Sequence, residues 1–551
     1  MKKIFCLLTI ISSFIFFVSC DPENVIDVQS ELSDTADYIW DSTKIVDISL
    51  KETLISVSGK GATALGSIVT ITKPGNYKIS GKLTNGQIVV NTIEEGRVRL
   101  ILNNADVTNL TSSPLFIANA ERTLIILPSG SINTFTDASN YIVTADSLNA
   151  TIFSKDFLGI YGEGTLNINA NYKGGITSKD ELEINSGNLN ITSVTTGIRG
   201  KDLLKIFDGN FIINCGGDAI KSDNDSTLTK GFVEIEGGTF SIVSTGDGIS
   251  ATNKITINGG DFNIKTGGGS TQPLSLTSSK GIKGSISVNI TGGAFTINSS
   301  DNSIHSTSDV TISGGTFIVS TGNRSIKSDT TLTINGGDIK IIQAFKGING
   351  HKMTINNGNI TISSQNDCLK GSRGDDLSTD DGSHIQINGG TLLLTSAKGD
   401  AVDSNGSINI NGGTLVVQGS QTTPDDAITY RSTFNIKGGN LIAAGAKTLY
   451  PSSTSVQNSI LIVFSSYLAP NTLINIQDEN SISKITFNVK KFALYVLISS
   501  SSLENGKTYN IYTGGIANGS DSNGFYTNGN YTPGNKRGTF TISGNFTSLL
   551  Y

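Results

Sequence analysis

The segment INGGTLLL, from Ile387 to Leu394, decides the fold, because close copies of it recur along the chain. The clearest other copies are INGGDFNI from Ile257, ISGGTFIV from Ile312, INGGDIKI from Ile334 and INGGTLVV from Ile410. The second glycines of neighbouring copies are often 22 residues apart, as Gly293, Gly315 and Gly337 are. A repeat of this length, made of short strands, is typical of a solenoid whose units pack on their neighbours.

Each repeat contains three apolar stretches. Apolar and polar residues alternate before and after the glycine pair, which is the pattern of a half-buried strand. A third stretch follows in a motif such as Asp-Ala-Ile-Lys-Ser, residues 218–222. Glycine, at 63 residues, suits the turns, and only nine prolines suit a ladder that needs its N–H donors. We therefore predict an all-β parallel β-helix with three strands in each coil.

Stacked coils place equivalent residues about 4.8 Å apart, so identical side chains at one position form a column. We expect an internal aromatic stack and a ladder of asparagine side chains, both of them scaffold. The predicted stack comprises Phe211, Phe240, Phe262, Phe295 and Phe317, and the predicted ladder comprises Asn335, Asn356, Asn388 and Asn411.

The sequence divides into four parts. Residues 1–19, with two lysines followed by an apolar run, have the pattern of a signal peptide. Residues 20–60 are interpreted as a lipid anchor on Cys20, a tether and the start of an N-terminal cap. Residues 61–448 are predicted to form the β-helix. In residues 449–551 the glycine pairs lose their period, which predicts a β-rich cap over the last coil.

The small residue Ser19 before Cys20 favours cleavage and lipidation there, as in bacterial lipoproteins. We therefore expect an exported protein, held at the outer membrane or cell surface through this anchor alone. Ordinary secretion without lipidation is the alternative.

The composition limits the class of partner. The net charge of −6 argues against nucleic acid. Charged residues make up only 16% of the chain, so Asn, Ser, Thr and Gly dominate the polar surface. Such a surface suits contact with sugars.

Several segments resemble bacterial carbohydrate-binding-domain proteins with a pectate-lyase-like, right-handed parallel β-helix. The matching segments are ITKPGNYKISGKLTNGQIVV from Ile71, IFSKDFLGIYGEGTLNI from Ile152, GGDAIKSDND from Gly216 and GKTYNIYTGG from Gly506. The resemblance implies a secreted or surface protein that binds acidic plant polysaccharide such as polygalacturonate, and also cellulose, with calcium in the fold. It also implies that the predicted β-helix, residues 61–448, is the carbohydrate-binding domain. It does not imply hydrolytic or lyase activity.

The first position of the Asp-Ala-Ile-Lys motif forms a column that bears on calcium. Along the chain this column reads Asp218, Asp247, Lys280, Asn302, Arg324, Lys346, Asp367, Asp400 and Asp426. Stacked carboxylates repel one another unless a proton or a cation lies between them. Calcium binds six to eight oxygens and suits such a position.

Two regions are therefore candidate calcium sites. The first comprises Asp218 and Asp247, with Asp223 in an acidic loop that leaves the same edge; the second comprises Asp367, Asp400 and Asp426. A second acidic loop carries Asp375, Asp376, Asp380 and Asp381. In the coils between the two regions, basic residues replace the carboxylates. The alternative is that these are turn residues, since Asp and Asn favour turns.

Three residues after this column, strand parity predicts outward side chains that are mostly basic. They are Lys221, Lys283, His305, Lys327 and Lys370. A basic row on a long face is suited to hold the carboxylates of a uronate polymer, alone or with calcium. The alternative is that these side chains only offset the nearby aspartates.

Catalysis is weakly indicated. The G-H-G and R-I-K motifs of polygalacturonases are absent. A pectate-lyase-like set of Asp218, Asp247 and Lys221 keeps lyase chemistry open. Three hypotheses follow: a calcium-assisted polysaccharide-binding lipoprotein without catalysis, a polysaccharide lyase, and a structural adhesin or spacer.

Overall fold

The computed structural model of the protein describes residues 37–142, 147–274, 276–374 and 379–551. The segment predicted to be a signal peptide and Cys20 lie outside these residues, as do Asp375 and Asp376. Residues 41–551 form one compact unit. The described residues contain no helix that is long and apolar enough to cross a membrane.

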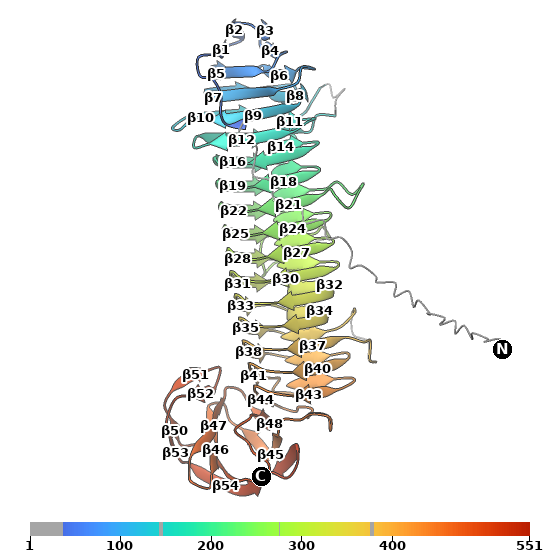
Figure 1. The fold of residues 1–551 in the computed structure, drawn as a ribbon, viewed down its shortest axis with the longest axis vertical. Helices are drawn as coiled ribbons and strands as arrows, with labels where there is room; N and C mark the ends of the chain where they lie inside the picture. Colours follow the sequence, from blue (N-terminus) through green and yellow to red (C-terminus); the bar gives the residue numbers. More distant parts are fainter. Residues whose placement is uncertain (1–36, 143–146, 275, 375–378) are drawn as a thin grey trace, which may run out of the picture. The chain divides into compact units, whose positions relative to one another are not determined.

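The unit is an all-β parallel β-helix, which confirms the predicted fold class (Figure 1). Each regular coil contributes three strands, and each strand pairs in parallel with the equivalent strand of the next coil, as β16 does with β19 and β19 with β22. We call the three resulting stacks the first, second and third columns.

The first column contains the strands that follow the glycine pairs. They are β10 (Ile132–Thr136), β13 (Thr165–Ala170), β16 (Asn188–Ser193), β19 (Asn210–Cys215), β22 (Thr239–Ser244), β25 (Asp261–Thr266), β28 (Ala294–Ser299), β31 (Thr316–Thr321), β33 (Asp338–Gln343), β35 (Asn359–Ser364), β38 (Thr391–Ser396), β41 (Thr414–Gln418) and β44 (Asn440–Gly445).

The second column contains the short strands of the Asp-Ala-Ile-Lys motif and its equivalents. They are β4 (Ile68–Ile71), β6 (Gln87–Asn91), β8 (Leu115–Asn119), β11 (Ala150–Ser154), β14 (Gly174–Ser178), β17 (Ile198–Gly200), β20 (Ile220–Ser222), β23 (Ile249–Ala251), β26 (Ile282–Gly284), β29 (Ile304–Ser306), the first parts of β32 (Arg324–Ile334) and β34 (Lys346–Ile355), β36 (Leu369–Gly371), β39 (Val402–Ser404) and β42 (Ile428–Tyr430).

The third column contains the strands that precede the glycine pairs. They are β9 (Arg122–Leu127), β12 (Leu158–Gly162), β15 (Glu181–Ile184), β18 (Leu203–Ile206), β21 (Phe232–Ile235), β24 (Lys254–Ile257), β27 (Ser287–Ile290), β30 (Asp309–Ile312), the second parts of β32 and β34, β37 (His384–Ile387), β40 (Ser407–Ile410) and β43 (Phe434–Ile436).

The predicted columns of side chains are present inside and at the turns. The rings of Phe240 and Phe262 stack with centroids 4.6 Å apart, and the other neighbouring pairs of the stack are 4.7 Å apart. The asparagine ladder is continuous, since Asn388 donates to Asn356 and accepts from Asn411, both over 2.7 Å. Both predictions are confirmed.

The second glycine of each pair is required by the turn. Gly260 has a φ of +110°, which side chains rarely adopt. A Cβ there would also lie 2.9 Å from the ring of Phe262. The glycine pair therefore makes room for the stack that defines the interior.

Both ends of the β-helix are closed by antiparallel strands. At the start, β1 (Ile45–Glu52) pairs with β2 (Leu54–Ser58) and β3 (Ala62–Leu65) pairs with β4, while β1, β5 (Gly75–Leu83) and β7 (Arg97–Thr108) stack in parallel. At the end, β48 (Ala493–Ser499) lies antiparallel to β44 and covers its edge. This arrangement confirms the predicted cap and removes an open strand edge.

The rest of the cap has its own apolar core, which Ile442 of β44 joins. Its remaining strands are β45 (Ser459–Leu468), β46 (Thr472–Asp478), β47 (Ser483–Val489), β49 (Thr508–Thr513), β50 (Ile516–Ala517), β51 (Ser520–Ser522), β52 (Phe525–Thr527), β53 (Tyr531–Thr532), β54 (Asn535–Thr541) and β55 (Phe546–Leu550).

Candidate functional site

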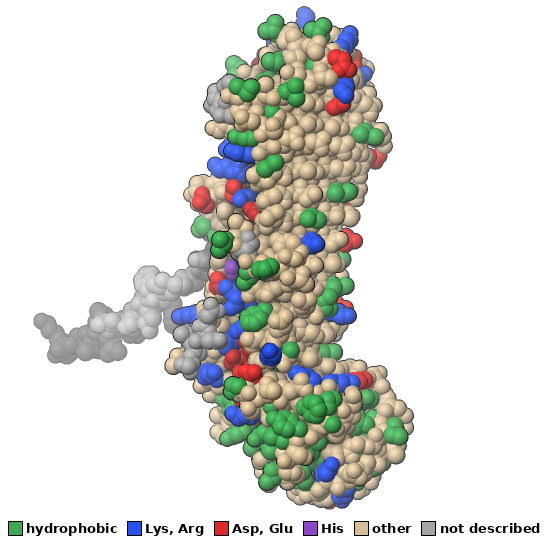
Figure 2. Space-filling model, turned by 180° about the vertical axis from the view of Figure 1, so that it is seen from behind, with side chains coloured by type: hydrophobic (Ala, Val, Ile, Leu, Met, Phe, Trp, Pro, Cys, Tyr) green, Lys and Arg blue, Asp and Glu red, His purple; other side chains and the backbone are tan. Residues whose placement is uncertain are grey.

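The second column carries most of the candidate residues, and its outward positions are in register. We call this line of outward side chains the charged row. It comprises Thr177, Arg199, Lys221, Ser250, Lys283, His305, Lys327, Asn349, Lys370, Asp403 and Thr429. Figure 2 shows acidic and basic side chains and a histidine gathered in one file, while uncharged side chains cover most of the neighbouring face.

The positions three residues before the charged row, which include Asp218 and Asp247, are also in register from coil to coil. The N–H of Ala219 donates to the carbonyl of Asp247 over 2.9 Å, and the N–H of Gly248 donates to the carbonyl of Lys280 over 2.9 Å. The insertions between coils therefore leave the predicted alignment of this column intact.

The carboxylates of this column accept backbone hydrogen bonds across coils. Asp218 accepts from the N–H of Asp247 over 2.9 Å, and Asp247 accepts from the N–H of Lys280 over 2.7 Å. Asp247 also accepts from the hydroxyl of Ser278 over 2.6 Å. These contacts give the Asp side chains a local structural role, as the turn-residue alternative requires.

The first candidate calcium region already has cations beside its carboxylates. The Lys221 ammonium lies 3.0 Å from Asp218, and the Lys283 ammonium lies 3.4 Å from Asp247. Asp223 accepts from Arg199 Nε over 2.8 Å. These carboxylates are compensated, because a basic side chain faces each one, from three residues on for Asp218, from the next coil for Asp247 and from the preceding coil for Asp223.

The second candidate region is more mixed. Asp367 is paired with Lys346 at 3.0 Å. Burial raises the pKa of Asp400 to about 7, and the neighbouring Asp403 adds to this shift. One oxygen of Asp426, Oδ1, is buried without a hydrogen-bond partner. Across the described ranges, no group of three or more His, Cys, Asp or Glu side chains is arranged as a metal site.

Two members of the predicted basic row are not exposed. Lys370 and His305 occupy outward positions of the row but are only 3% and 8% exposed, because neighbouring side chains cover them. Lys370 is covered because its ammonium donates to Asp403 and, over 3.0 Å, to Asn405 of the following coil. Burial and the nearby Lys327 lower the pKa of His305 to about 4, so this ring is neutral at pH 7.

The partly exposed members of the predicted basic row are Lys221, Lys283 and Lys327, whose side chains are 25–33% exposed to solvent. Lys327 lies 2.8 Å from Asp329, so each of the three has a carboxylate partner. A pocket of about 290 Å³ opens beside Lys327, and Arg324, Arg373 and Asp329 contribute to its lining. Basic side chains outnumber carboxylates there.

The pectate-lyase-like set does not form an open catalytic group. Lys221 lies 3.0 Å from Asp218 and 3.9 Å from Asp223, so two carboxylates occupy the surroundings of its ammonium. A base that removes a sugar proton must reach that proton. In this arrangement carboxylates of the chain itself already surround the Lys221 ammonium.

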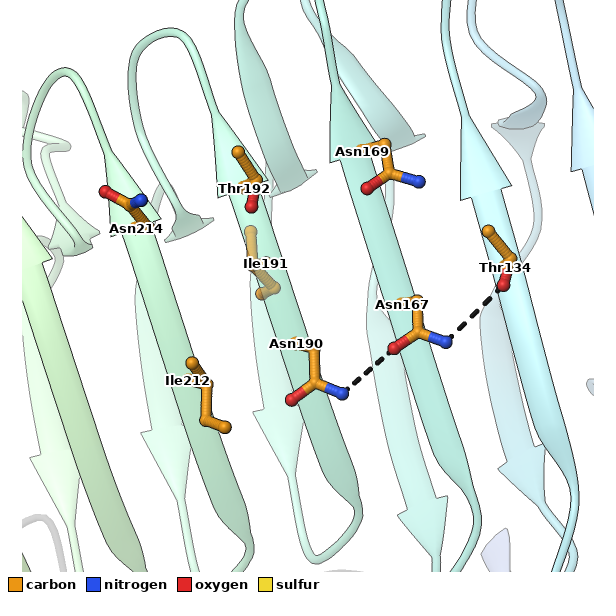
Figure 3. A pocket seen from close by; sticks show the side chains of 8 residues that line it. All are labelled: Thr134, Asn167, Asn169, Asn190, Ile191, Thr192, Ile212 and Asn214. Carbon is orange, nitrogen blue, oxygen red and sulfur yellow. Dashed lines mark hydrogen bonds between the residues drawn. The ribbon is translucent and has the colours of Figure 1, made fainter.

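A polar groove follows the outer face of the first column near its start (Figure 3). It has a volume of about 340 Å³. Asn190 donates to Asn167 over 2.9 Å, and Asn167 donates to Thr134 over 3.4 Å, so amide and hydroxyl groups follow one another from coil to coil. The exposed side chain of Ile212 lies on the same face. Sequence analysis did not single out this surface, although the repeated Asn at outward positions is visible in it.

A second surface that sequence analysis missed lies at the start of the charged row. It is a pocket of about 280 Å³ to which Lys173, Lys179 and Arg199 contribute. The signal for it is in the repeat, because residues 196–199 read Thr-Gly-Ile-Arg and retain the basic position while Thr196 replaces the acidic one.

Comparisons with known proteins agree with a surface that binds sugars. A family model described as carbohydrate-binding domain-containing protein matches residues 65–325 and 318–460. A curated carbohydrate-binding domain-containing protein from Acetivibrio thermocellus is 39% identical over 126 residues, which are 22% of this chain and 44% of that protein. The chain therefore spans less than half the length of this relative.

A solved structure, of a polysaccharide lyase-like protein from C. thermocellum in a gadolinium derivative, is 34% identical. The match covers 40% of this chain and 92% of that one, with a TM-score of 0.40. The family model spans well over half of the sequence. The chain belongs to the family of carbohydrate-binding domain-containing proteins.

Proposed function

We propose that the protein binds acidic polysaccharide of the polygalacturonate type along the charged row, without cleaving it. The observation that carries this proposal is the register of the row, in which Lys221, Lys283 and Lys327 occupy one position of different coils. A linear polymer that follows the stack meets these cations in succession. Membership of a carbohydrate-binding family supports a sugar ligand, and the cations support an acidic one.

Charge in the pocket beside Lys327 supports the same ligand. Arg324, Lys327 and Arg373 contribute to its lining, and Asp329 is the one carboxylate among the described residues that line it. An arginine guanidinium donates in a planar fork that matches a carboxylate. A uronate is thus better suited to this pocket than a neutral sugar.

The expected affinity comes from many weak contacts. An exposed ion pair contributes about 1 kcal/mol or less, and each of these lysines already has a carboxylate nearby. Useful affinity therefore requires several pairs along one polymer. Salt should weaken binding, because it screens exposed charges.

A neutral polymer such as cellulose is the second candidate ligand. The polar groove favours it, because Asn167 and Asn190 present donors and acceptors without charge on successive coils. Binding there should depend little on salt.

Retention on immobilised polygalacturonate tests the proposal. Lys221, Lys283 and Lys327 should be changed together to Gln, which removes charge without placing a new carboxylate beside Asp218, Asp247 or Asp329. We expect the triple variant to lose retention. A matched control changes three exposed lysines on other faces, Lys254, Lys265 and Lys437, to Gln and should be retained like the wild type.

Other outcomes select the other hypotheses. Equal retention of both triple variants would contradict the proposed face. Release of an unsaturated uronide, detected by its ultraviolet absorbance, would identify a lyase. Failure of the wild type to bind any glycan would favour an adhesin or spacer.

We also propose that calcium assists at Asp400 and Asp426. Support comes from the buried, unpartnered Oδ1 of Asp426 and from the burial of Asp400, which has carboxylates nearby. Calcium would neutralise these carboxylates and accept further oxygen ligands. Asp218, Asp223, Asp247 and Asp367 fit the ion less well, because their basic partners lie closer than Lys447, which is 3.8 Å from Asp426.

The N-terminal sequence supports a further proposal about location. A lipid on Cys20 would hold the mature protein at the outer membrane or cell surface. Changing Cys20 to Ser should move the protein from the membrane fraction to the soluble fraction, and an unchanged distribution would contradict the anchor.

A further inference from the structure

The pocket at the start of the charged row differs from the rest of the row in its charge. Lys173, Lys179 and Arg199 contribute to its lining, and among the lining residues that the structure describes Asp223 is the one carboxylate. It lies beside Lys221, because Arg199 pairs with Lys221 in register. It is thus continuous with the proposed binding face.

The excess of positive charge follows from one replacement in the repeat. In the next coils, Asp218 faces Lys221 and Asp247 faces Lys283. The equivalent position beside Arg199 is Thr196. The carbonyl of Thr196 accepts a hydrogen bond from the N–H of Gly175, in the preceding coil, over 2.9 Å. This coil keeps its basic residue and lacks the acidic partner.

Arg199 obtains a partner from another segment. Its Nε donates over 2.8 Å to Asp223, which begins an inserted loop. The other oxygen of Asp223 lies 3.9 Å from Lys221, so one carboxylate serves two cations. Lys173 and Lys179 form no ion pair within the described parts of the chain.

The environment of Lys179 shows the effect of this imbalance. Burial lowers the pKa of Lys179, and the nearby Arg199 and Lys201 lower it further. Proton loss is favoured where cations crowd together. An anion that enters such a pocket relieves the repulsion, so its binding is favourable.

Uncharged groups of the pocket match the hydroxyls of a sugar. Thr177 and Thr196 contribute hydroxyl groups to the lining. The Oδ1 of Asn149 is buried without a hydrogen-bond partner. It can accept a hydrogen bond from a ligand hydroxyl, which a simple inorganic anion without a proton does not offer.

We propose that this pocket binds one acidic sugar unit of a polysaccharide through its oxyanion, either a uronate carboxylate or a sulfate ester. Lys173 and Lys179 contact the oxyanion, and Asp223 limits the affinity by competing for Arg199. The inference rests on the proposed function, because it makes the pocket an anchoring subsite at one end of the charged row.

Two substitutions of opposite effect test the subsite. Lys179→Gln should weaken binding to polygalacturonate by up to about five-fold, the ratio that corresponds to the loss of one surface ion pair. Asp223→Asn should strengthen it by a similar ratio, because Arg199 loses its competing partner. Lys254→Gln, an exposed lysine of the third column, serves as the matched control and should leave binding unchanged.

A parallel measurement with dextran sulfate separates the two sources of the oxyanion. Weakening of Lys179→Gln on either polymer supports the subsite and identifies its anion. Protection of Lys179 from amine acetylation by bound polymer, with Lys254 unprotected, supports it without any variant.

Failure of the subsite and failure of the proposed function give different results. If the wild type binds polygalacturonate and Lys179→Gln binds equally well, the subsite is wrong and the proposed function stands. If the wild type binds only dextran sulfate and Lys179→Gln weakens it, the polygalacturonate assignment is wrong and the subsite stands. If Asp223→Asn weakens binding and EDTA abolishes the difference, Asp223 is a calcium ligand and the subsite is overturned.

Discussion

The carboxylate of Asp218 accepts a hydrogen bond from the backbone N–H of Asp247 over 2.9 Å, across two adjacent coils. The same side chain lies 3.0 Å from the Lys221 ammonium. One aspartate thus satisfies a backbone donor and balances a cation of the charged row. The repeated Asp at this position is explained by coil stacking, apart from any ligand.

Replacing Asp218 separates these two roles. Asp218→Asn keeps an acceptor for the N–H of Asp247 but loses the ion pair, whereas Asp218→Ala loses both. We expect Asp218→Ala to be less stable than Asp218→Asn by about 1–3 kcal/mol, the cost of a buried donor left without a partner. Chemical denaturation of the two variants measures this difference. Equal stability would show that the backbone contact contributes little.

The aromatic stack should be the least tolerant part of the interior. Phe262 lies 4.6 Å from Phe240 and 4.7 Å from Phe295, centroid to centroid. Phe262→Ala leaves a cavity between the two rings and should cost about 3–5 kcal/mol. Hydrogen exchange should rise in the adjoining coils first, because each coil contacts only its neighbours. Ile212→Ala, at an exposed position of the first column, is the control, and an equal loss from both would contradict a special role for the stack.

The sequence was sufficient for the fold because one period carries both strands and turns. Alternation around Gly260 predicted the strands, and equivalent positions predicted the Phe262 stack and the Asn388 ladder. These features depend on a residue and its counterpart one repeat away, so they can be read without coordinates.

The site was less predictable because its ion pairs join residues whose side-chain directions are not periodic. Lys370 was expected outside, yet it is buried because Asp403 and Asn405 of the next coil accept from its ammonium. The pocket at Lys179 was not predicted, because the prediction rested on the Asp repeated from coil to coil, and Thr196 stands at that position in this coil. A comparison of this position from coil to coil would have shown that this coil lacks the acidic residue, and this was the signal in the sequence.

Calcium binding at Asp400 and Asp426 makes a thermal prediction. At pH 8 calcium should raise the melting temperature of the wild type, because it neutralises the partly buried Asp400 and the buried Asp426. Asp400→Asn still accepts from the N–H of Asp426 but lacks the charge, so the calcium effect should shrink. Asp218→Asn is the matched control in the other candidate region and should keep the wild-type response. Identical melting of the wild type in calcium and in EDTA would exclude this site.

His305 predicts how stability depends on pH. Its pKa falls from the ordinary 6.5 to about 4, chiefly because the ring is buried and secondly because Lys327 is near, while Asp329 acts in the opposite direction. Between these two values the unfolded chain holds a proton that the folded protein does not. Stability is therefore full above pH 6.5 and declines as the pH falls toward 4.

Replacing His305 with Gln removes this contribution, because Gln does not titrate. Between pH 7 and pH 4 the wild type should lose up to about 3 kcal/mol more stability than His305→Gln, as a shift of this size implies. Denaturant unfolding of both proteins at each pH measures the difference, and the other titrating groups cancel in the comparison. Parallel curves would mean that folding does not shift the pKa of the ring. A wild type that loses less stability than His305→Gln would mean that the ring is protonated in the folded protein, with Asp329 as its partner. In that case His305 would join the cations of the charged row, and acid would strengthen its hold on a uronate polymer instead of weakening the fold.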